Sequence, residues 1–191
     1  MGKAEILVVG GGHAGIEASN IISKLGKKNI LITMDLSAIG RMSCNPAIGG
    51  VAKGQMVREI DMLGGLMGRT ADASGLQHKL LNKSKGRSVW SPRSQIDKKL
   101  YEKIAQKYIK EQGLGVLEGE VVSLNIKKDS ICGVFLKDGS EVVCSAAVLT
   151  CGTFLNGLIH IGSEQINAGR YGEKRAEGVT ENLNSLGLRS G

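Results

Sequence analysis

The sequence has few aromatic residues, few prolines and no paired cysteines. Aromatic residues make up 3% of the 191 residues, so the core must be mostly aliphatic, and only two prolines are present. The four cysteines form no CxxC pair and no spacing typical of metal ligands, so we predict no metal site. No apolar run is long enough to span a membrane, and none resembles a signal peptide. We therefore expect a cytoplasmic protein with reduced cysteines.

Glycine and basic residues, in contrast, are abundant. The chain has 28 glycines without a Gly-X-Y period, which indicates many tight turns such as those of cofactor-binding loops. The 25 Lys and Arg outnumber the 18 Asp and Glu, giving a formal charge of +7. This charge favours an anionic partner, either a nucleotide or a nucleic acid, although a protein with an ordinary basic surface would have the same composition.

The first 33 residues fit a βαβ nucleotide-binding unit. The apolar run at 5–9 predicts a buried parallel strand, and a GxGxxG motif follows it directly. Apolar residues then recur at helical spacing as far as Gly26, and 29–33 predicts a second buried strand. In such a unit, the glycines allow a tight turn and close approach of a pyrophosphate, which the helix N-terminus attracts. The predicted cofactor-binding residues of this loop are Gly10, Gly11, Gly12, His13, Ala14 and Gly15.

The position of the usual ribose-binding acid is occupied by Thr33. Its hydroxyl is one candidate for the ribose contact, and Asp35, two residues later, is another. The missing acid also leaves open a nucleotide-binding module without catalysis.

The order of the later elements favours FAD over NAD as the dinucleotide. The sequence predicts a glycine-rich insertion, a helix, a small antiparallel β-meander and a last buried strand, at about 40–93, 94–112, 116–144 and 146–150 respectively. Within the insertion, a short helix is predicted over 55–63. An NAD dehydrogenase would more often continue with alternating strands and helices.

We therefore predict an α/β fold, specifically a Rossmann-type FAD-binding domain similar to that of glutathione reductase. This domain is expected over 1–165, with the start of a further region over 166–191.

A glycine-flanked loop at 40–50 contains Cys44, which is the cysteine that lies outside the predicted strands. A thiolate in such a loop is a candidate nucleophile or a neighbour of the flavin ring. The alternative is a small residue that fills space beside the Asn45-Pro46 turn.

A basic stretch runs from Lys79 to Lys110 and contains ten Lys or Arg but only two acids. Those from residue 98 onward fit the solvated face of the predicted helix. The irregular part around Trp90 is a better candidate for contacts with an RNA backbone, and the tryptophan could stack on a base or lie in the core. The candidate RNA contacts are Lys83, Lys85, Arg87 and Arg93.

Several blocks of the sequence, taken in order, resemble one family. They are the segments 8–15, 42–50, 59–65, 149–157 and 159–162. They are similar to the MnmG (GidA) proteins, which are FAD enzymes of tRNA wobble-uridine modification. The Ser-Cys-Asn-Pro-Ala-Ile-Gly-Gly block is the most specific, and it argues against the related flavoprotein that methylates uridine in the tRNA T-loop.

The resemblance implies a reaction and its partners. Such an enzyme acts with the GTPase MnmE to add a carboxymethylaminomethyl-type group to C5 of the wobble uridine in tRNA. Methylenetetrahydrofolate supplies the carbon, glycine or ammonium the amine, and NADH the reducing equivalents. A homodimer, and a heterotetramer with MnmE, are implied as well.

The resemblance also implies site residues. It places the glycine loop at the FAD pyrophosphate, Val121 at the adenine and Gly152 near the dinucleotide, and Cys44 matches a cysteine proposed to take part in the chemistry.

Two segments depart from the family pattern. The family's Ser-Lys-Gly-Pro-Ala-Val stands here as 84–89 with Arg87-Ser88 in place of Pro-Ala, and a flavin-contacting serine falls near Ala176. Family members are several times longer, so we expect this chain alone not to catalyse the full reaction. The alternative function is a flavin- or NAD-dependent oxidoreductase acting on a small molecule.

Overall fold

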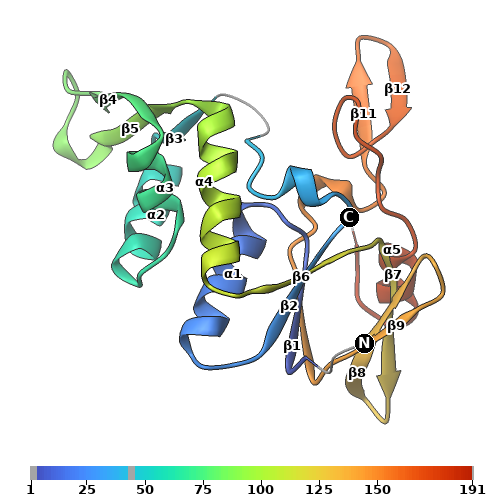
Figure 1. Ribbon diagram of the computed structural model, residues 1–191. Coiled ribbons are helices and arrows are strands. Elements are labelled where there is room, and N and C mark those ends of the chain that lie inside the picture. Colours follow the sequence, from blue (N-terminus) through green and yellow to red (C-terminus); the bar gives the residue numbers. More distant parts are fainter. Residues whose placement is uncertain (1–3, 43–45, 191) are drawn as a thin grey trace.

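The computed structural model describes residues 4–42 and 46–190, and it has a four-stranded parallel sheet at its centre (Figure 1). The strands are β1 (Ile6–Val9), β2 (Asn29–Thr33), β6 (Gly115–Glu118) and β10 (Ala146–Leu149). Their order in the sheet is β10-β1-β2-β6, so the chain fills one side of β1 before it returns to the other. The strand order therefore reverses beside β1, which is where open α/β sheets bind ligands.

Alternate residues of β1 enter two different cores. Val8 packs with buried residues of α1 (His13–Lys24) and α4 (Lys98–Glu111). Leu7 and Val9 point to the opposite face and pack against antiparallel strands. Because both faces of β1 are buried, its sequence is a continuous apolar run rather than an alternating one.

The antiparallel strands form the predicted β-meander. They are β7 (Val121–Lys127), β8 (Ser130–Leu136) and β9 (Glu141–Val143). The predicted start of this meander at residue 116 is wrong, because residues 115–118 form β6, which pairs in parallel with β2. The meander instead begins at Val121, after the chain has left the central sheet.

The insertion that the sequence predicts to be irregular contains regular structure. Its elements are β3 (Ala47–Gly49), α2 (Lys53–Met62), α3 (Met67–Ala73), β4 (Gly75–Leu81), the 3-10 turn η2 (Arg87–Val89) and β5 (Ser91–Ile96). The helix predicted over 55–63 is confirmed as α2. The predicted start of the next helix at residue 94 is wrong, because residues 94–96 pair within β5. Asp97 then caps α4 by accepting hydrogen bonds from the amides of Lys99 and Leu100.

This insertion has a small core of its own. Figure 1 shows β3, β4 and β5 on the α4 side of the molecule, away from the meander. The buried side chains of the cluster are Met42, Ile48, Val57, Met67, Ala71, Ile96 and Tyr101. The insertion therefore shares its core with α4, which supplies Tyr101, and the Leu66 and Met67 amides also donate to Glu17 of α1.

After β10, the chain forms a short 3-10 turn, a projecting hairpin and a last helix (Figure 1). These are η3 (Gly152–Phe154), β11 (Leu158–Ile161), β12 (Glu164–Asn167) and α5 (Val179–Ser185). Within the region expected to begin at residue 166, Val179 is buried in the same cluster as the meander. The short 3-10 turn η1 (Leu36–Ala38) follows β2. No helix among the described residues is long and apolar enough to cross a membrane.

Candidate dinucleotide-binding site

A pocket opens where β1, β2 and β10 end. Its walls come from the loop after β1, the segment after β2, the start of β7, the turn η3 and a segment around residues 170–176. The carboxyl ends of three parallel strands thus meet at this pocket, beside the reversal of strand order. This is the position at which a Rossmann-type sheet binds a nucleotide.

Gly10, Gly12 and Gly15 of the loop after β1 have different structural roles. A Cβ on Gly10, whose φ is +113°, would lie 2.5 Å from the carbonyl oxygen of Thr150, so the turn requires glycine. A Cβ on Gly15 would lie 1.8 Å from the carbonyl oxygen of Gly10, so this glycine lets α1 pack against the strand. A Cβ on Gly12 would meet no atom within 4 Å, and Gly12 lines the pocket. Gly12 therefore leaves space for a ligand, as a phosphate-binding loop does.

The N-terminus of α1 is chemically suited to an anion. Gly12 is the N-cap and has no side chain to accept hydrogen bonds from the first-turn amides, and the first turn contains no acidic residue. The amides and the positive end of the helix dipole are thus available to a phosphate at the pocket. The described residues at this site fit the diphosphate of a dinucleotide.

Thr33 and Asp35 lie at the end of β2, and both line the pocket. Thr33 is buried against the glycine loop, and its hydroxyl donates to the Asp35 carbonyl oxygen at 3.3 Å. The Asp35 carboxylate accepts from the Ser37 amide at 2.7 Å, and hydrogen bonding by Ser37 lowers its pKa. The carboxylate is therefore ionised at neutral pH and can accept a hydrogen bond from a ribose hydroxyl.

Two residues that the family resemblance implied lie on the same pocket. Val121 begins β7 and is buried, and Gly152 begins η3. Together with Gly10, Gly11, Gly12 and Thr33, they form part of the pocket wall. The geometry thus brings together residues that lie far apart in sequence, and their contacts with a ligand remain predictions.

His13 lies beside the pocket rather than in its wall. Its ring packs edge-to-face against Tyr101 with the ring centroids 5.5 Å apart, and Nε2 has no hydrogen-bond partner among the described residues. Burial lowers the His13 pKa to about 4, and the positive charges of Lys53 and Arg170 act in the same direction. The imidazole is therefore neutral at physiological pH. Ala14 and Gly15 also lie outside the pocket wall.

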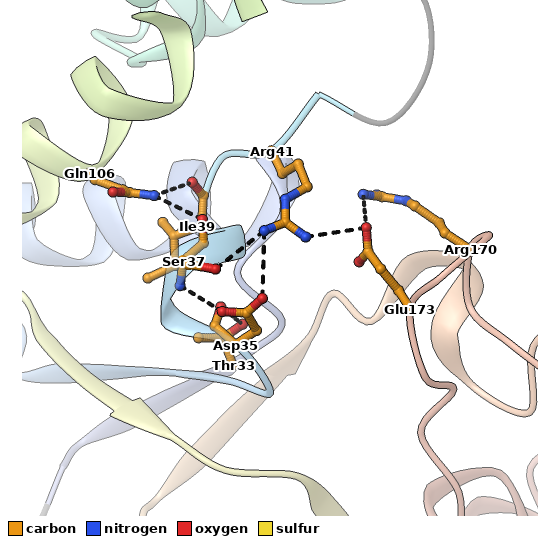
Figure 2. Close-up of polar contacts among 8 residues, drawn as sticks. All are labelled: Thr33, Asp35, Ser37, Ile39, Arg41, Gln106, Arg170 and Glu173. Atoms are coloured by element: carbon orange, nitrogen blue, oxygen red, sulfur yellow. Dashed lines mark hydrogen bonds and ion pairs between the residues drawn. The ribbon is translucent and has the colours of Figure 1, made fainter. Parts of the chain in front are cut away.

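The pocket also contains a charged cluster, of which the sequence predicted Asp35 alone (Figure 2). Arg41 forms ion pairs with Asp35 at 3.5 Å and with Glu173 at 3.3 Å, and Arg170 pairs with Glu173 at 3.8 Å. The cluster joins the segment after β2 to the segment before α5. No local sequence signal links these positions, because the fold alone brings them together.

The basic candidates for RNA contact lie elsewhere, on and around the connection between β4 and β5. Lys83, Lys85 and Arg87 are exposed, and Arg93 is partly buried within β5. Trp90 is 36% exposed, and the Arg87 guanidinium lies 5.6 Å from the centroid of its ring. This tryptophan is therefore at the surface rather than in the core. Cys44, the candidate nucleophile, lies outside the described residues.

Comparisons with known proteins show which family this chain resembles. Residues 5–191 match the family described as Glucose inhibited division protein A. The chain is 44% identical over 190 residues to the tRNA uridine 5-carboxymethylaminomethyl modification enzyme MnmG of Protochlamydia amoebophila, covering 99% of the chain and 30% of that protein. It is 49% identical over 189 residues to MnmG of Chlorobium phaeobacteroides, covering 98% of the chain and 30% of that protein.

A solved structure supports the same relationship. GidA of Aquifex aeolicus superimposes with a TM-score of 0.93 at 44% identity, covering 98% of this chain and 31% of that one. The predicted Rossmann-type α/β fold and the resemblance to MnmG (GidA) proteins are both confirmed, and the chain spans about 30% of the length of these relatives. A match that covers nearly the whole chain, in sequence and in structure, places it in the Glucose inhibited division protein A family.

Proposed function

We propose that this chain is the FAD-binding part of a tRNA-modifying flavoenzyme. The observation that carries the proposal is the open space at Gly12, at the uncapped N-terminus of α1 and at the reversal of strand order. The relatives are tRNA uridine 5-carboxymethylaminomethyl modification enzymes, and they supply the reaction class. The proposed whole enzyme adds a carboxymethylaminomethyl-type group to C5 of the wobble uridine in tRNA.

Within this chain, different pocket residues would bind different parts of FAD. The first-turn amides of α1 would hold the diphosphate, because no side chain caps them. Thr33 or Asp35 would accept hydrogen bonds from the ribose, and Val121 and Gly152 would border the dinucleotide from the other wall. When bound, FAD would supply the redox chemistry of the reaction.

The remaining components belong to the proposed full-length enzyme. They are NADH as reductant, methylenetetrahydrofolate as carbon donor, the GTPase MnmE as partner and a homodimeric assembly that forms a heterotetramer with MnmE. Because this chain spans about 30% of its relatives, we expect it to bind FAD without modifying tRNA.

For tRNA, we propose that the basic connection between β4 and β5 contacts the phosphate backbone. Lys83, Lys85 and Arg87 are exposed there, and the ring of Trp90 is accessible beside them. Phosphate contacts by such residues are not sequence-specific and weaken as salt increases. The surface would therefore orient the tRNA, while the choice of uridine would be made elsewhere.

The first test is the visible absorption spectrum of the purified chain, with chromatography of any cofactor released on denaturation. Flavin bands and released FAD are the expected result. If the chain is colourless, it should be titrated with FAD and with NAD by isothermal titration calorimetry. Binding of NAD in preference to FAD would refute the flavoprotein assignment and favour a dehydrogenase acting on a small molecule.

A further inference from the structure

Arg170 brings a positive charge to the dinucleotide pocket from a segment far from the glycine loop. It lies in the pocket wall together with Gly12. Arg170 and Glu173 are the ends of a tight turn, in which the Glu173 amide donates to the Arg170 carbonyl oxygen at 3.0 Å and the Gly169 amide donates to the Glu173 carbonyl oxygen at 3.2 Å. The backbone of this turn therefore fixes where the Arg170 side chain begins.

The turn is in addition fastened to the wall of the pocket. The Thr153 hydroxyl donates to the Gly169 carbonyl oxygen at 3.1 Å, and the Ala168 amide donates to the Gly157 carbonyl oxygen at 3.0 Å. A Cβ on Gly169 would lie 2.3 Å from the ring of Phe154, so the backbone of the turn packs directly on η3. The turn thus cannot move away from the pocket without breaking these contacts.

The Arg170 side chain is held in position but keeps hydrogen-bonding capacity. Its guanidinium lies over the Phe154 ring, 5.2 Å from the centroid, and pairs with Glu173 at 3.8 Å. Glu173 is closer to Arg41, at 3.3 Å, and Arg41 also pairs with Asp35 (Figure 2). A guanidinium has five N–H donors, so one long ion pair leaves most of its capacity for another acceptor.

The charge of Arg170 also reaches the phosphate-binding helix. It contributes, after burial and Lys53, to lowering the pKa of His13 in the first turn of α1. The guanidinium and the positive end of α1 thus act on the same space. The two carboxylates at this pocket, on Asp35 and Glu173, are both already paired with Arg41. A ligand anion would meet the Arg170 guanidinium and the positive end of α1 there.

We propose that Arg170 is a second phosphate-binding residue of this pocket, which receives the diphosphate of the dinucleotide through a pair of N–H donors. Glu173 is a positioning residue that orients the guanidinium. A planar guanidinium suits a phosphate because two parallel hydrogen bonds form at once. This inference rests on the proposed binding of FAD and adds to it a ligand contributed by the segment before α5.

The test is a titration of the chain, freed of cofactor, with FAD at low and high salt, for wild type and three variants. Arg170→Gln is expected to weaken FAD binding roughly tenfold to a hundredfold, which is the range for a hydrogen bond to a charged group. It should also make the affinity less dependent on salt, because a charge pair is lost. Arg175→Gln is the matched control, because Arg175 lies in the same segment, pairs with Glu177 at 2.7 Å and is not in the pocket wall. It should bind FAD within about twofold of wild type, because its partners, Glu177 and Asn167, also lie outside the pocket wall.

Circular dichroism and urea unfolding without FAD check that each variant is folded. If Arg170→Gln does not fold, Arg170→Lys tests whether the planar guanidinium binds the diphosphate, because this variant keeps the charge but loses the planar donor pair. It is expected to bind FAD roughly threefold to tenfold more weakly, with the salt dependence of wild type. Folded Arg170 variants that match wild type in affinity and salt dependence would overturn the inference. A wild-type chain that binds no FAD would instead overturn the proposed function.

Discussion

Replacing Gly12 with alanine should separate the loss of ligand binding from the loss of folding. The added Cβ meets no protein atom within 4 Å, and the backbone of Gly12, with φ −74° and ψ −175°, is open to any residue. Alanine restricts the unfolded chain, which stabilises the fold by about 0.4–1 kcal/mol. Alanine is also a poorer N-cap than glycine, which costs about 0.5–1 kcal/mol. The two effects oppose each other, so we expect the free energy of unfolding to change by less than about 1 kcal/mol.

The same methyl group should weaken FAD binding. It enters the space that Gly12 leaves for the approach of the diphosphate to the backbone. We expect a loss of at least about tenfold in affinity, which corresponds to about 1.4 kcal/mol. Urea unfolding followed by circular dichroism measures the stability, and quenching of flavin fluorescence measures the affinity.

Gly15→Ala is the matched control within the same loop. Its Cβ would lie 1.8 Å from the Gly10 carbonyl oxygen, so the helix must shift and stability should fall by about 1–3 kcal/mol or more. The reasoning is refuted if Gly12→Ala binds FAD as tightly as wild type. It is equally refuted if Gly12→Ala destabilises the chain as much as Gly15→Ala does.

Three further predictions concern buried and basic side chains. Because the folded-state pKa of His13 is about 4, below its ordinary value of about 6.5, the stability that it contributes is present above pH 6.5 and is lost as the pH falls from there through 4. His13→Gln should reduce this acid sensitivity in urea unfolding measured across that range, and an unchanged pH dependence would contradict the assignment. Tyr101→Phe should not lower the free energy of unfolding, because the Tyr101 hydroxyl is buried without a hydrogen-bond partner among the described residues. A loss above about 1 kcal/mol would indicate a hydrogen bond to that hydroxyl. In the full-length protein, changing Lys83, Lys85 and Arg87 together to Gln should weaken tRNA binding and flatten its salt dependence, and FAD affinity should stay unchanged. Filter binding at several salt concentrations tests this, and tRNA affinity equal to that of wild type would exclude the basic connection as a contact.

The βαβ unit could be predicted from the sequence because its signals are local. The apolar run of β1, the glycine motif and the helical spacing of α1 lie next to one another in the chain, and Gly26 takes the positive φ expected after a helix. The correct start of α4 could also have been predicted, because Asp97 is a typical N-cap that stands directly before the helical pattern.

Long-range pairings could not be predicted in this way. β6 is an edge strand with only two apolar residues, Val116 and Leu117, and only its pairing with β2 assigns it to the central sheet rather than to the meander. The ion pair between Arg41 and Glu173 has the same origin, because it depends on where the segment after η3 returns. Local patterns predicted the glycine loop and Thr33, and the family resemblance added Val121 and Gly152. Neither predicted Arg41, Arg170 and Glu173, which only the fold brings together.

The pairing of β1 with β10 has a consequence for how the protein is made. Ile6 pairs with Ala146, and the Thr150 hydroxyl donates to the carbonyl oxygens of Val9 and Gly10. During synthesis, the glycine loop therefore leaves the ribosome well before Thr150, the residue against which it packs. Contacts between such distant segments slow folding, because the intervening chain must close a long loop. We therefore expect the chain to acquire its cofactor late in folding, so that the cofactor stabilises a nearly finished domain and does not serve as the nucleus around which the domain forms.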